Sequence, residues 1–106
     1  MDPQGLVNTM VGAGQALGAD VWSGISTYAV PELKKIAIQI EAIAAHLDDY
    51  TEDGARALFK MQVDASIGVI VAMTQLTLLA VQKMINTILS AIRNEVNGAL
   101  GFALLV

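Results

Sequence analysis

The sequence contains no cysteine and few aromatic or charged residues. Aromatic residues make up 5% of its 106 residues and charged residues 15%, whereas typical soluble domains contain about 25% charged residues. Without cysteine the chain has no disulfide, no thiol nucleophile and no thiolate metal site. Hydrophobic residues make up 55% of this short chain. Because small proteins have a high surface-to-volume ratio, we expect other subunits or lipid to cover part of this apolar surface.

Basic residues are also scarce. The chain has six Lys or Arg residues against ten Asp or Glu residues, which gives a formal net charge of −4. The basic residues are scattered along the sequence and form no basic stripe, so we expect no nucleic-acid partner. The N-terminal sequence MDPQGLVNTM lacks the basic and apolar regions of a signal peptide.

The aliphatic composition predicts an all-α fold. We expect a helical hairpin with one long C-terminal helix, preceded by a Gly-rich N-terminal helix, in a single small domain spanning residues 1–106. The helices are predicted at about 3–27, 31–48 and 52–97, with an apolar tail at 98–106. Asp2 and Thr51 are suited to cap helix N-termini. Val30-Pro31 should separate the first two helices, because proline disfavours a helical conformation in the preceding residue.

Two patterns predict contacts between helices. A GxxxG spacing in the first segment allows close approach of a neighbouring helix. An apolar stripe on the second helix predicts antiparallel packing on the third helix. The expected packing residues are Gly14, Gly18, Leu33, Ile36, Ile40, Ile43 and Leu47.

The predicted long helix contains an uncharged run at residues 65–81. As a helix this run would measure roughly 26 Å, slightly less than the ~30 Å hydrocarbon core of a bilayer. Polar residues recur along one side of the helix, at spacings close to multiples of the helical repeat. A helix of this kind is better suited to form a wall shared within an assembly, where it packs between subunits, than to anchor a single chain in a membrane. The expected polar stripe comprises Gln75, Gln82, Asn86, Ser90 and Arg93.

The sequence indicates no catalytic, cofactor-binding or metal site. Residues 49–54 (DYTEDG) match the first half of an EF-hand loop, but Lys60 takes the place of its bidentate glutamate. His46 is the only histidine, and Asp49 is its one nearby partner in the sequence. We therefore expect a structural or solvent-facing histidine and a protein that is not an enzyme.

Residues 57–93 resemble in pattern the C-terminal helix of type III secretion needle and inner-rod subunits. The resemblance lies in Met61-Gln62 near the start and in Ile88-Leu89 and Ile92-Arg93 near the end. It implies a small helical subunit that polymerises. The apolar stretch after Arg93 departs from those subunits. Small helical membrane-associated proteins of lipid-containing phages, and phage ejection proteins, share this composition.

These patterns predict a non-enzymatic structural subunit of a multi-copy, membrane-associated assembly, of virion, secretion or channel type. The expected partners are many copies of the same chain, with a lipid bilayer or other assembly proteins as further candidates. Two alternatives remain open. A small membrane-inserting pore or holin-like protein would need a cleaner span. A soluble homodimeric helical module would form a discrete dimer without filaments.

Overall fold

A computed structural model describes residues 1–106 and confirms the all-α prediction. It contains five α-helices and one short 3-10 helix, and no strand. The elements are α1 (Pro3–Gln15), α2 (Ala19–Ala45), η1 (Leu47–Asp49), α3 (Glu52–Thr74), α4 (Leu78–Ser90) and α5 (Arg93–Leu100).

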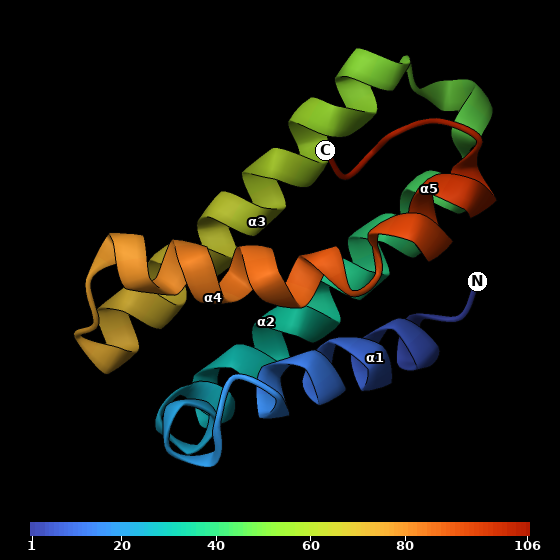
Figure 1. Cartoon of the computed structure of the whole chain (residues 1–106). Coiled ribbons are helices and arrows are strands. Elements are labelled where there is room, and N and C mark those ends of the chain that lie inside the picture. The colour runs from blue at the N-terminus through green and yellow to red at the C-terminus, as the bar shows by residue number, and fades with distance from the viewer.

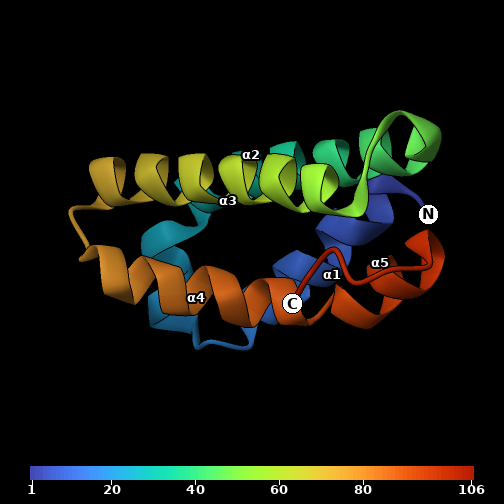
Figure 2. The ribbon, with the colours of Figure 1, turned by 90° about the horizontal axis from the view of Figure 1, so that it is seen from above.

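The first four α-helices form a closed ring around one core. Helix α2 packs on α1 and α3, and α4 also packs on α1 and α3, so each helix has two neighbours (Figures 1 and 2). This is the arrangement of a four-helix bundle. The short helix α5 packs on α2 and α4. The resulting body measures 41 × 22 × 19 Å, and its core of 24 buried residues draws on every α-helix and the C-terminal tail.

Local capping starts two of the helices as predicted. The Asp2 carboxylate accepts hydrogen bonds from the backbone N–H groups of Gln4 and Gly5, both at 3.3 Å, at the start of α1. The Thr51 hydroxyl accepts one from the Gly54 N–H at 2.9 Å at the start of α3. Each side chain satisfies backbone donors that have no partner within their helix.

The prediction of one helix over residues 3–27 is wrong. The first helix ends at Gln15, and α2 begins after Gly18. Gly18 has φ +118°, a conformation that only glycine adopts without strain, and it reverses the chain. Contrary to expectation, Gly18 is exposed and contacts no neighbouring helix, because it lies in this turn.

Gly14 does lie at a helix contact. It is buried, and an added Cβ would overlap the ring of Trp22 on α2. By contrast, Gly12 in the same helix has open space around the position of a Cβ. The absence of a side chain at Gly14 therefore allows Trp22 to pack on α1.

This pair of glycines predicts stability changes of opposite sign. We expect Gly14→Ala to lower the free energy of unfolding by about 1–3 kcal/mol, because the new methyl displaces the Trp22 ring. Gly12→Ala should raise it by roughly 0.5–1 kcal/mol, since alanine is the better helix former at an exposed interior position. Urea unfolding followed by circular dichroism measures both changes. A stabilising effect of Gly14→Ala would contradict the packing role.

The expected break at Val30-Pro31 is absent, because α2 continues through Pro31 to Ala45. An internal proline removes one backbone hydrogen bond and crowds the preceding turn. Pro31 is exposed, as is Thr27 one turn earlier, so the proline ring lies on the outer side of the helix. Burial of Ala29 and Leu33 on the inner side of the helix offsets the cost of the proline.

The predicted long helix over residues 52–97 is also wrong, because the chain folds back between α3 and α4 (Figure 2). Gln75 adopts a left-handed conformation with φ 61° and ends α3. The Thr74 hydroxyl donates to the Ile70 carbonyl and accepts from the Leu76 N–H, and the Thr77 hydroxyl caps α4. Gln75, predicted to belong to the polar stripe of a continuous helix, thus lies in a turn instead. A second break follows at residues 91–92, before α5.

The C-terminal tail docks on the chain's own core. Leu104 and Leu105 are buried, with 2% and 6% of their surface exposed. The Asn97 side chain accepts hydrogen bonds from the backbone N–H groups of both leucines and donates one to the Leu105 carbonyl, at 2.8–3.0 Å. The apolar side chains of Leu104 and Leu105 are therefore covered by the chain's own core.

Candidate functional site

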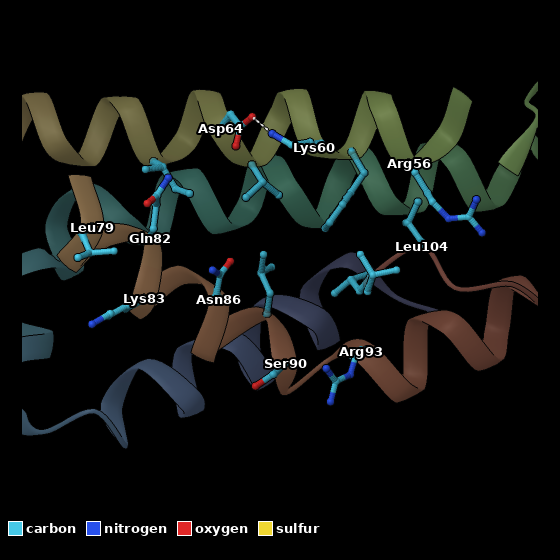
Figure 3. A pocket seen from close by; sticks show the side chains of 16 residues that line it. Arg56, Lys60, Asp64, Leu79, Gln82, Lys83, Asn86, Ser90, Arg93 and Leu104 are labelled. Carbon is cyan, nitrogen blue, oxygen red and sulfur yellow. Dashed lines mark hydrogen bonds and ion pairs between the residues drawn. The ribbon is translucent and has the colours of Figure 1, made fainter. Parts of the chain in front are cut away.

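A groove of about 720 Å³ lies between α3 and α4, and residues 104–106 of the tail close one part of it (Figure 3). The turn at residues 75–77 creates the groove, because it brings the inner faces of two helices opposite each other. Pockets of roughly 300–1,000 Å³ are typical of small-molecule sites.

The floor of the groove is apolar. On α3 it is formed by residues 59, 63 and 67, which share a helix face because they are spaced four apart. Leu89 of α4 and the two tail leucines complete it. These side chains are mostly buried but retain 2–8% exposure. The floor residues are Phe59, Val63, Ile67, Leu89, Leu104 and Leu105.

Most of the predicted polar stripe lies along the groove. Gln82, Asn86, Ser90 and Arg93 form its rim on the α4 and α5 side. Gln75 does not join them, because it sits in the turn that ends α3. These residues border an apolar groove within one chain, whereas the sequence suggested a wall shared within an assembly.

Basic side chains gather around the groove. Arg56 and Lys60 lie on the α3 rim, and Lys83 and Arg93 lie on the opposite rim, so four of the chain's six basic residues line it. Asp64 is the only acidic residue in the lining. The groove is therefore locally cationic in a protein whose net charge is −4.

The basic residues on the two rims differ in how they are paired. Arg56 forms an ion pair with Asp53 at 3.0 Å and donates to the Ala103 carbonyl at 2.7 Å. Lys60 is 2.6 Å from Asp64. The side chains of Lys83 and Arg93 form no ion pair and no hydrogen bond within the chain. The α4 and α5 rim therefore holds the free positive charge.

The residues predicted to pack α2 mostly lie in the core. Leu33, Ile36, Ile40 and Ile43 are fully buried, and α2 packs on α3. Leu47 falls in η1, where 38% of its surface is exposed. The stripe thus ends one turn earlier than its spacing suggested, because α2 stops at Ala45.

His46 lies outside the groove. It is exposed and is 3.6 Å from the equally exposed Asp49. No group of three or more His, Asp or Glu side chains is placed to hold a metal ion. Sequence reasoning did not single out Glu32, which is buried on α2 and forms an ion pair with Lys35 at 2.9 Å. The two residues are three positions apart, and this spacing on a helix was the sequence feature that could have indicated their ion pair.

A second surface feature is an apolar hairpin tip where α3 turns into α4. Its side chains are 38–61% exposed, and no charged residue occurs at positions 65–82. The hairpin tip is defined by Val69, Met73, Leu76, Leu78 and Leu79.

Comparison with protein-family models, curated proteins and solved structures gives no match. A function for this chain is therefore inferred from its own geometry.

Proposed function

We propose that this chain is a non-enzymatic structural subunit that assembles in several copies through its hairpin tip. The observation that carries the proposal is the gathering of five large, exposed apolar side chains in an uncharged stretch. Contiguous exposed apolar patches of soluble proteins mark surfaces that bind other proteins or membranes. Another copy of the chain would remove this patch from water.

The outer face of α3 extends the patch along the bundle. Met61, Ala65, Val69 and Met73 are spaced four apart and are all exposed, so they lie on one side of the helix. Met61 retains 68% of its surface exposure. A helix of a neighbouring copy can pack along this side, because alanine at position 65 leaves room for close approach.

A second candidate function is insertion into a membrane as a pore or holin-like protein. Helix α3 is long and apolar enough to cross a bilayer by length and composition, and only 28% of its most apolar window is buried in the bundle. One such helix is weak support, since core helices of soluble proteins meet the same criteria. We further propose that the assembly is membrane-associated, in a virion, a secretion apparatus or a channel.

Light scattering coupled to size-exclusion chromatography tests the assembly proposal. We expect wild-type protein to form species larger than a dimer in detergent-free buffer. Met73→Glu combined with Leu78→Glu should yield monomers, because two charges would be buried at the contact. Ile38→Glu is the control, since Ile38 on α2 is 60% exposed but lies outside the patch.

Four results would contradict this proposal. A wild-type monomer, or charge variants that assemble as wild type does, would overturn it. A discrete dimer would support the soluble homodimeric module instead. Monomers that enter liposomes and release a trapped dye would support the pore-forming candidate.

A further inference from the structure

We propose that the groove between α3 and α4 binds the anion of a single-chain fatty acid. The hairpin tip shares Leu79 with the groove, but Met73 and Leu78, whose replacement tests assembly, do not line the groove. This inference therefore goes beyond the assembly proposal and does not depend on it.

The groove carries its two arginines at one end. Figure 3 shows Arg56 and Arg93 on opposite rims near Leu104, while Leu79 lies toward the other end together with Gln82 and Lys83. The floor between the two ends is aliphatic apart from Phe59. A ligand with one charged head near the arginines and one apolar chain along the floor matches this arrangement.

The charge around the groove selects an anion. Four basic residues and one acidic residue line it, and Asp64 already pairs with Lys60. Arg93 is exposed and has no partner within the chain, so its guanidinium is available to a ligand. A planar guanidinium and a carboxylate can form two parallel hydrogen bonds. The side-chain amide of Asn86 adds a hydrogen-bond donor on the same rim.

The size of the groove suits a small ligand. Its volume of about 720 Å³ lies within the range of small-molecule pockets. Each methylene moved from water to the apolar floor contributes about 0.8 kcal/mol, so affinity should rise with chain length until the floor is filled.

Isothermal titration of the full chain with laurate, kept below its micelle concentration, tests the proposal. We expect saturable binding of one laurate per chain. Dodecyltrimethylammonium, which has a chain of the same length and the opposite charge, should bind at least about 10-fold more weakly. Acetate should show no binding, because it lacks the chain.

Variants then assign the binding to the groove. Arg93→Gln should weaken laurate binding by about 10-fold, the usual scale for loss of one charge-assisted hydrogen-bonding group. Lys34→Gln is the matched control, because Lys34 is exposed on α2 and does not line the groove. Amide NMR shifts on laurate addition should concentrate on residues 59–67 and 82–93.

Several outcomes would overturn the proposal. These are absence of saturable binding, equal affinity for the two surfactants of opposite charge, or equal effects of Arg93→Gln and Lys34→Gln. Laurate-induced shifts confined to the hairpin tip would mean nonspecific surfactant binding. The Met73→Glu/Leu78→Glu variant separates the two proposals, because neither residue lines the groove. It should lose assembly and still bind laurate.

Discussion

In urea unfolding, Ile40→Ala is expected to lower the free energy of unfolding by about 2–5 kcal/mol. Ile40 is fully buried on α2, the helix that packs on both α1 and α3. Truncation removes buried methyl and methylene groups and leaves a cavity that the rigid bundle fills only in part. Domains of this size are stable by about 5–15 kcal/mol, so the loss is a large share of the total.

Ile38→Ala provides the matched control for Ile40→Ala. Ile38 is two residues away on the same helix, and 60% of its surface is exposed. We expect this variant to change the free energy of unfolding by less than about 0.5 kcal/mol, as surface substitutions generally do. An Ile40→Ala loss as small as that of Ile38→Ala would mean that the α2 face containing Ile40 is not in the core.

Asn97→Ala should destabilise the protein by about 2–4 kcal/mol. One side chain makes three hydrogen bonds to the backbone of Leu104 and Leu105. Each is worth roughly 0.5–1.5 kcal/mol, and backbone groups left buried without partners add further cost. Amide hydrogen exchange at Leu104 and Leu105 should become much faster, because Asn97 is the acceptor for both N–H groups.

Asn94→Ala is the control for the tail. Asn94 lies on the same short helix, is exposed and makes no side-chain hydrogen bond. Its replacement should leave the exchange rates of Leu104 and Leu105 unchanged and alter stability by less than about 0.5 kcal/mol. If the two asparagine variants behaved alike, Asn97 would not hold the tail.

The groove could be anticipated from the sequence on one side only. Gln82, Asn86 and Ser90 are spaced four apart, so their common face on a helix follows from the helical repeat alone. Arg56 and Lys60 are far from them in the sequence. They reach the opposite rim only because the chain reverses at Gln75. A scattered set of basic residues therefore becomes a cationic groove through folding.

Local chemistry was sufficient to predict the structural features that depend on residues close together in the sequence. The all-α class, the caps at Asp2 and Thr51, and the apolar stripe from Leu33 to Ile43 all follow from composition, short-range hydrogen bonding and helical spacing. These interactions involve residues within about one to three turns, and every one of them is visible in the order of residues.

Tertiary packing decided where the helices end. Pro31 and the run containing Gln75 carry weak and opposing local preferences: proline suggests a break, and the uncharged run suggests continuity. Burial in the core overrides both local preferences. Helix α2 continues through Pro31 because it gains core contacts on each side of the proline. The chain turns at Gln75 because α4 buries Val81, Ile85 and Ile88 only by folding back. The sequence by itself determined a helical chain with strong apolar faces. The tertiary structure decided which of those faces pack together, and so produced the closed bundle, the groove and the docked tail. Burial of several side chains outweighs the conformational preferences of single residues, which amount to roughly 1–3 kcal/mol.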